Sequence, residues 1–310
     1  MQNKMFVSLQ YLRGFAAIIV VYYHIFGTWG GNQGVAIFFV ISGFIMAYLI
    51  NEKQRGWEHF LLSRYLRVAP LYYIATLLVL LLGIGYDPSV LRIITSFGFI
   101  SLGTVLPVGW TLTYEFIFYS ICTFAIAMSF FKLKKEYMIY TILILIDIAL
   151  YTILSYKNYD YGHYFLVFLY GMVLYRLYYS TLFEKRSYFM AIMTLVISMI
   201  IISITEIKIN FFIEYGVMAF LLVGVMLYFE KHNILNKKVD FLLLLGNASY
   251  SIYISHWIVI QVFSLQKISL FFVSIVIGVL VYFIIERPLH KYTKHLLNKE
   301  YKIKGFDNEK

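Results

Sequence analysis

Six ionisable side chains lie inside long apolar runs of this sequence, where each is a candidate for function. They are Arg13, His24, Glu115, Asp147, Glu214 and His256. Inside a lipid bilayer an ionisable side chain costs several kcal/mol by insertion scales, so it is rare without a role. An imidazole can take a proton from a hydroxyl and a carboxylate can orient that imidazole, so these residue types indicate acid–base chemistry.

His24 ends the first apolar run in the order Tyr22-Tyr23-His24. Counting about 16 residues from Ser8 at ~1.5 Å each places it about 24 Å along a helix, toward the outer side. An imidazole titrates near neutral pH, which suits a general base acting on a hydroxyl. The alternative is an interfacial histidine that is hydrogen-bonded to a neighbouring helix, and position alone does not separate the two.

Glu115 follows Trp110 by five residues, just inside the outer end of a predicted inward-running helix. Glu115 and Tyr119 share a helix face because they are four residues apart. At this depth the carboxylate could orient His24 and stabilise its protonated form. The alternative is a structural ion pair with Arg13 or Arg176.

Arg64 and Arg67 precede Pro70 at the inner mouth of the third predicted span. Three residues apart on a helix, they project together and could bind phosphate groups in bidentate fashion. Basic residues at such a mouth also serve simply to anchor topology, and this reading stays open.

His256 falls near mid-membrane in a stretch rich in hydroxyl side chains that includes Ser251 and Tyr253. Such a stripe suits either a polar substrate pocket or hydrogen bonding between helices. Gly34 and the pair Ser42-Gly43 predict close helix approach.

Two further observations concern an acidic residue without a predicted role and the prospect of a metal site. Asp147 is isolated in the sequence without an evident partner. No His/Asp/Glu cluster has the spacing of metal ligands, so we expect no metal.

The composition requires a bilayer around these residues. Of the 310 residues, 61% are hydrophobic and 14% are charged, and the mean hydropathy is +0.77. We therefore predict an all-α polytopic membrane protein of about ten transmembrane helices. The predicted spans are 9–27, 34–51, 70–84, 110–131, 137–156, 163–179, 187–204, 211–229, 248–265 and 268–286.

The distribution of charge supports this topology. With a cytoplasmic N-terminus, the inner segments hold 20 of the 26 Lys and Arg, the outer segments hold four, and Arg13 and Arg176 lie within spans. The positive-inside rule then places both termini in the cytoplasm. The net charge of +10 therefore indicates cytoplasmic loops rich in Lys and Arg that contact anionic lipids, and not nucleic-acid binding. The single Cys122 excludes an internal disulfide.

Two segments outside the spans complete the expected organisation. The outer loop 85–109 is apolar enough to lie along the interface or to re-enter the membrane. We expect residues 1–290 to form one transmembrane domain and 291–310 a cytoplasmic tail resting on the headgroups.

The motifs together resemble the membrane acyltransferase-3 family, and most closely its exopolysaccharide O-acetyltransferase branch. The resemblance rests on Leu12-Arg13-Gly-Phe-Ala16 with His24, on Gly34 to Phe44, on Arg64-x-x-Arg67, on Gly109-Trp110-Thr-Leu-x-x-Glu115-x-x-x-Tyr119, and on Ser249-Tyr-Ser251-Ile-Tyr253-x-x-His256. These occur in the family's order and extend over most of the chain. Two departures are Ala36, where family members often carry an acidic residue, and Trp257, where many have proline.

The resemblance implies an acyl-CoA donor, acetyl-CoA, and an acceptor hydroxyl on a polysaccharide or lipid-linked glycan. It implies that His24 is catalytic, and we expect Glu115 to take part by holding its imidazole. It also implies that Arg64 and Arg67 hold the phosphates of coenzyme A, and we expect Arg13 to bind coenzyme A with them. We further expect substrate contacts from a set of residues in these motifs. They are Trp110, Tyr119, Ser251, Tyr253 and His256.

The function expected from these residues is O-acyl transfer in a bacterial cytoplasmic membrane. The acyl group would be acetyl or another short chain, transferred directly or through an acyl-enzyme. The alternative is a transporter or flippase for polysaccharide or lipid-linked sugar, which would also need about ten helices and a polar interior. Transporters often show two hydropathically similar halves, and no such symmetry is evident here.

Overall fold

The fold was analysed in a computed structural model of the chain. The structure describes residues 5–27, 30–52, 56–84, 88–100, 103–128, 135–156, 163–185, 189, 192–193, 212–234 and 238–307. Throughout these residues the regular secondary structure is helical, which confirms the all-α prediction. The predicted span 187–204 lies almost entirely outside the described residues.

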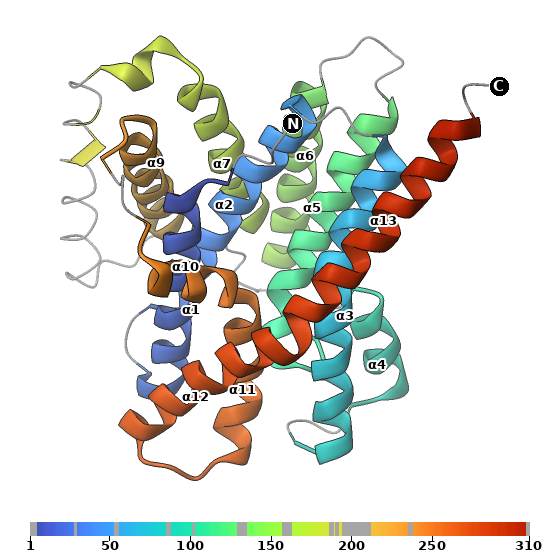
Figure 1. Ribbon diagram of the computed structural model, residues 1–310, viewed down its shortest axis with the longest axis vertical. Coiled ribbons are helices and arrows are strands. Elements are labelled where there is room, and N and C mark those ends of the chain that lie inside the picture. The colour runs from blue at the N-terminus through green and yellow to red at the C-terminus, as the bar shows by residue number, and fades with distance from the viewer. Residues whose placement is uncertain are drawn as a thin grey trace.

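Figure 1 shows the order of the helices along the chain. The α-helices are α1 Val7–Phe26, α2 Gly31–Glu52, α3 Trp57–Leu82, α4 Val90–Phe97, α5 Trp110–Ala127, α6 Lys135–Tyr156, α7 Tyr164–Tyr178, α9 Val217–Lys231, α10 Asp240–Asn247, α11 Ser249–Val262, α12 Lys267–Val281 and α13 Arg287–Asp307. Short 3-10 turns η1 (Pro107–Gly109) and η3 (Thr181–Glu184), and π turns η4 (Phe212–Gly216) and η5 (Tyr282–Glu286), extend or join them.

Six helices in the described ranges are long and apolar enough to cross a membrane, and there are seven if the bent pair α10–α11 counts as one span. The axes of that pair differ by 63°. On the outside of the bundle, α12 leaves Ile268, Phe272 and Val276 well exposed, as a helix that faces lipid does. The protein is therefore a multi-pass membrane protein, while ten spans and the orientation of the termini stay predictions.

The third helix differs from the predicted span 70–84, because α3 begins at Trp57 and continues through Pro70. Arg64 and Arg67 lower the local hydropathy, so the sequence pattern starts the span too late. They do not interrupt the helix. Proline costs α3 one backbone hydrogen bond at that turn. As a result, the arginine pair lies within the bundle on a regular helix.

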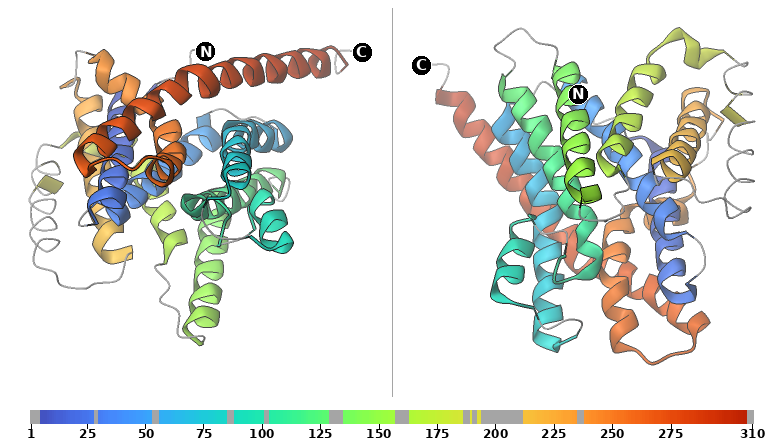
Figure 2. Two further views of the ribbon diagram at one scale, coloured as in Figure 1. Left: turned by 90° about the horizontal axis from the view of Figure 1, so that it is seen from below. Right: turned by 180° about the vertical axis from the view of Figure 1, so that it is seen from behind.

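The direction of the helices separates the arginine pair of α3 from His24 of α1. Arg64 and Arg67 lie in the first half of α3, and His24 lies in the last turn of α1. Figure 1 shows both helices descending, so α3 begins in the upper half and α1 ends in the lower half. The opposite view in Figure 2 agrees. The start of α1 and the end of α13 both lie in the upper half of Figure 1.

Glycines set the closest helix crossings, as predicted. A Cβ on Gly34 would lie 2.7 Å from the carbonyl oxygen of Ala16, between α2 and α1. Where α2 crosses α7, a Cβ on Gly43 would collide with the carbonyl of Phe168, and one on Gly171 with that of Val40. Because backbone meets backbone there, α2 is held at the centre of the bundle.

Gly171→Ala is expected to destabilise the bundle, because the new methyl group would meet the rigid carbonyl of Val40 rather than a movable side chain. Overpacking of this kind costs about 1–3 kcal/mol or more. Thermal unfolding of the purified protein in detergent should therefore occur several degrees lower. Gly56→Ala is the control, since a Cβ at Gly56 meets nothing within 4 Å. Equal melting temperatures for the two variants would contradict this packing.

Candidate active site

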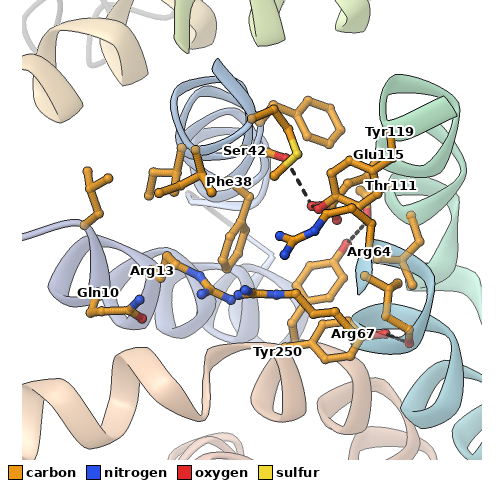
Figure 3. A pocket seen from close by; sticks show the side chains of 18 of the residues that line it. Gln10, Arg13, Phe38, Ser42, Arg64, Arg67, Thr111, Glu115, Tyr119 and Tyr250 are labelled. Atoms are coloured by element: carbon orange, nitrogen blue, oxygen red, sulfur yellow. Dashed lines mark hydrogen bonds between the residues drawn. The ribbon is translucent and has the colours of Figure 1, made fainter. Parts of the chain in front are cut away.

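A cavity of about 310 Å³ lies between α1, α2, α3, α5, α11 and the end of η5. Its wall is mostly apolar, and polar side chains from several helices point into it (Figure 3). The polar lining residues are Gln10, Arg13, Ser42, Arg64, Arg67, Thr111, Glu115, Tyr119, Tyr250, Tyr253 and Glu286. A concave apolar site with a few converging polar groups is typical of a binding site for a small molecule.

Three guanidinium groups converge in this cavity. Arg64 and Arg67 come from one face of α3 and Arg13 comes from α1. Figure 3 shows the side chains of Arg13 and Arg67 meeting near the centre, with Arg64 approaching from the side of Glu115. Among the described residues no carboxylate oxygen lies within 4.0 Å of Arg13 or Arg67. Arg13 and Arg67 are half-buried and outside ion-pair distance of the described carboxylates, which favours an anion in the cavity.

Glu115 belongs to this cavity and not to His24. Its Oε1 accepts a hydrogen bond from Ser42 Oγ at 3.2 Å and another from the hydroxyl of Tyr119. The shared face of Glu115 and Tyr119 is thus confirmed. The described contacts include none between Glu115 and His24, so the expected carboxylate–imidazole pair is not formed.

Glu115 and His24 do not meet because α5 begins inside the bundle rather than at its surface. The segment before it is buried in the bundle: Leu106 is fully buried, and Val105 and Val108 are nearly so. The chain has therefore already entered the bundle when α5 begins at Trp110. Counting depth from a helix that starts at the surface placed Glu115 too near the outer end.

The partner of His24 is His256. His24 Nδ1 lies 2.9 Å from the carbonyl oxygen of Val20 and 3.2 Å from His256 Nε2, and the ring centroids are 4.9 Å apart. His24 is exposed at the surface of the described bundle, whereas His256 is fully buried. Sequence reasoning missed this pair, although the depth of His256 along α11 could have indicated it.

One layer of side chains separates the arginine cavity from the histidine pair. Tyr253 lines the cavity, and its ring centroid lies 5.9 Å from that of His256. Its hydroxyl is held by Thr111 Oγ1 at 2.8 Å and by the carbonyl of Val108 at 3.0 Å. Phe38 packs edge-on against Tyr253 at 5.8 Å. The cavity therefore ends one residue away from the histidines.

The other residues expected to bind substrate divide into two groups. Tyr119 and Tyr253 line the cavity, but Trp110, Ser251 and His256 do not. Trp110 packs on Tyr164 with ring centroids 5.2 Å apart. Ser251 donates its backbone N–H and its hydroxyl to the carboxylate of Glu286, a structural contact in the first turn of α11.

Sequence reasoning also missed further polar lining residues, including Gln10, Thr111, Tyr250 and Glu286. Gln10 precedes Arg13 by three residues on α1, so helical spacing alone could have placed it there. Its side-chain oxygen is buried and has no hydrogen-bond partner among the described residues. Such an acceptor points to a ligand donor or a water in the cavity.

Two charged residues have structural partners elsewhere. Asp147 is buried and its Oδ2 lies 2.6 Å from Nδ1 of His163 at the start of α7. Arg176 pairs with Glu136, and not with Glu115 as the ion-pair alternative allowed. Within the described ranges, no group of three or more His, Cys, Asp or Glu is placed to hold a metal ion.

Comparison with known proteins gives a family match and two partial relatives. Residues 6–287 match the family described as an acyltransferase domain, acyltransferase-3. The peptidoglycan O-acetyltransferase OatA of Listeria monocytogenes is 31% identical over 97 residues, which are 29% of this chain and 16% of that protein. The exopolysaccharide production protein ExoZ of Rhizobium meliloti is 33% identical over 104 residues, 29% of this chain and 33% of ExoZ.

These alignments cover well under two thirds of each relative, and no solved structure matches the chain. Neither relative is named as a transporter, so the transporter alternative has no support. The family match, in contrast, extends over α1 to the start of α13 and includes both the arginine cavity and the histidine pair. The chain belongs to the acyltransferase-3 family of membrane proteins.

Proposed function

We propose that this protein is a membrane O-acetyltransferase that moves an acetyl group from acetyl-CoA to a hydroxyl of a cell-surface or exported polysaccharide. The observation that carries the proposal is the arginine cavity, which ends one residue layer from the histidine pair. The names of the two relatives support a glycan acceptor, peptidoglycan in one case and exopolysaccharide in the other. The cytoplasmic membrane of a bacterium is the proposed location.

The donor would bind through its phosphates. Arg64 and Arg67 face one cavity with Arg13, and a guanidinium binds phosphate oxygens in bidentate fashion. The long pantetheine arm would then lie along the apolar part of the wall and carry the thioester past Tyr253. Glu115, held by Ser42 and Tyr119, would shape this donor site rather than orient the base.

The chemistry would take place at His24. A carbonyl oxygen only accepts hydrogen bonds, so Nδ1 of His24 carries the proton shared with Val20, and Nε2 of the neutral ring keeps its lone pair. Nε2 would take the proton of the sugar hydroxyl as its oxygen attacks the thioester carbonyl. The new C–O bond forms, the C–S bond breaks, and the thiolate of coenzyme A recovers the proton from His24.

The acceptor would approach from the surface on which His24 is exposed. It would be a polysaccharide chain or a lipid-linked glycan, and the acyl group would be acetyl or another short chain. Direct transfer in a ternary complex needs no covalent carrier. The hydroxyl of Ser42, which is hydrogen-bonded to Glu115, lies in the donor cavity and not beside His24.

His24→Ala is expected to reduce glycan acetylation at least about a hundredfold, because general-base catalysis is worth about 10²–10⁴-fold. The measurement is mass spectrometry of surface polysaccharide from cells that express each variant at matched abundance. His295→Ala, an exposed histidine on α13 far along the chain, is the control. Normal acetylation in the His24 variant would remove His24 from the reaction.

Arg64→Ala and Arg67→Ala are each expected to weaken binding of coenzyme A by about tenfold or more, since a charge-assisted hydrogen bond is worth about 1.5–3 kcal/mol. Equilibrium binding of labelled coenzyme A to purified protein measures this, and the affinity of the unaltered protein should fall with added salt. Arg92→Ala is the matched control, because Arg92 binds the carbonyl of Gly103 outside the cavity. Unchanged affinity in both arginine variants would refute phosphate binding in this cavity.

A further inference from the structure

His256 has neither ring nitrogen available for a substrate. Its Nδ1 lies 2.6 Å from the carbonyl oxygen of Tyr253 on the same helix, and its Nε2 lies 3.2 Å from His24 Nδ1. The side chain is fully buried and does not line the cavity. The expected role in substrate binding therefore has no geometric basis.

The hydrogen bonds of the pair fix the protons on both rings. The carbonyl of Tyr253 can only accept, so His256 carries its proton on Nδ1, and Nε2 of the neutral ring is an acceptor. It therefore accepts from Nδ1–H of His24, which is shared between His256 and the carbonyl of Val20. The lone pair of His24 is left on Nε2. Among the described residues, that nitrogen has no hydrogen-bond partner.

We propose that His256 is a positioning residue that fixes the tautomer and ring orientation of His24, the catalytic base. The inference rests on the proposed function. His256 takes the place that a carboxylate fills in a catalytic triad, but as a neutral acceptor. When His24 takes the hydroxyl proton at Nε2, its Nδ1–H stays bonded to His256, so the imidazolium is held in place through the reaction.

The packing of α11 holds His256 in register for this role. A Cβ on Gly278 of α12 would lie 2.6 Å from the Cα of Ile252, so the two helices are in direct backbone contact beside His256. In the first turn of α11, Ser251 donates two hydrogen bonds to Glu286. These contacts limit both sliding and rotation of α11 against α12. Nε2 of His256 is therefore kept within hydrogen-bonding distance of His24 on α1.

The test compares His256→Gln with His256→Met. The two side chains have the same length, but only the glutamine amide oxygen can accept a hydrogen bond where His256 Nε2 stands. Steady-state acetyl transfer from acetyl-CoA to glycan is measured on purified full-length protein. We expect kcat of the Met variant to fall about a hundredfold with KM for acetyl-CoA within about twofold. The kcat of the Gln variant should be within about tenfold of that of the unaltered enzyme.

Controls separate this role from simple packing. Ser255→Ala should leave kcat unchanged, because the neighbouring Ser255 hydroxyl is buried and has no partner among the described residues. Each variant is checked for coenzyme A binding. If the Met variant does not bind, His256→Leu replaces it as the variant without an acceptor. Equal losses in the Gln variant and the variant without an acceptor, or a loss that appears only in KM, would overturn the inference.

His24→Ala in the same assay separates the two proposals. An active His24→Ala variant would refute the proposed function itself. An inactive His24→Ala variant together with normal kcat in His256→Met would refute only the positioning role.

Discussion

The structure depends on holding positive charge inside an apolar bundle. Arg13, Arg64 and Arg67 line one cavity, and the desolvation of cations is costly unless counter-charge compensates it. Glu115 and Glu286 line the same cavity and offset part of this charge, while they accept hydrogen bonds from Ser42, Tyr119 and Ser251. Three guanidinium groups against two carboxylates leave the cavity with a net positive charge, which suits an anionic ligand such as the phosphate groups of the proposed donor.

A single helix connects this charged cavity to the proposed chemistry. Arg13 and His24 lie on α1, eleven residues apart, which is about 16 Å along a straight helix. A donor held by its phosphates would need a long arm to reach the imidazole, and Tyr253 marks the end of the cavity through which that arm would pass. The tight glycine crossings of α2 with α1 and α7 keep these groups at fixed positions. In the proposed mechanism the donor binds at the arginines and reacts at His24, on the other side of Tyr253.

Much of this could be predicted from composition and spacing. Apolar runs indicate helices, three-residue spacing put Arg64 and Arg67 on one face, and four-residue spacing did the same for Glu115 and Tyr119. Depth was harder to predict, because η1 enters the bundle before α5 begins and so moves Glu115 away from His24. The pairing of His24 with His256 joins residues 232 positions apart, and it depends on how α11 packs on α1. The depth of each histidine along its helix is a local signal, but which helices pack together is not.

The central claim is that one molecule of donor extends from the arginines to His24. A structure of the protein with a non-hydrolysable acetyl-CoA analogue, determined by cryo-electron microscopy in lipid nanodiscs, tests it most directly. The account predicts phosphate oxygens within hydrogen-bonding distance of Arg64 and Arg67, and the analogue's acyl carbon beyond Tyr253 next to Nε2 of His24. An analogue bound outside this cavity, or one whose acyl group ends on the arginine side of Tyr253, would contradict it.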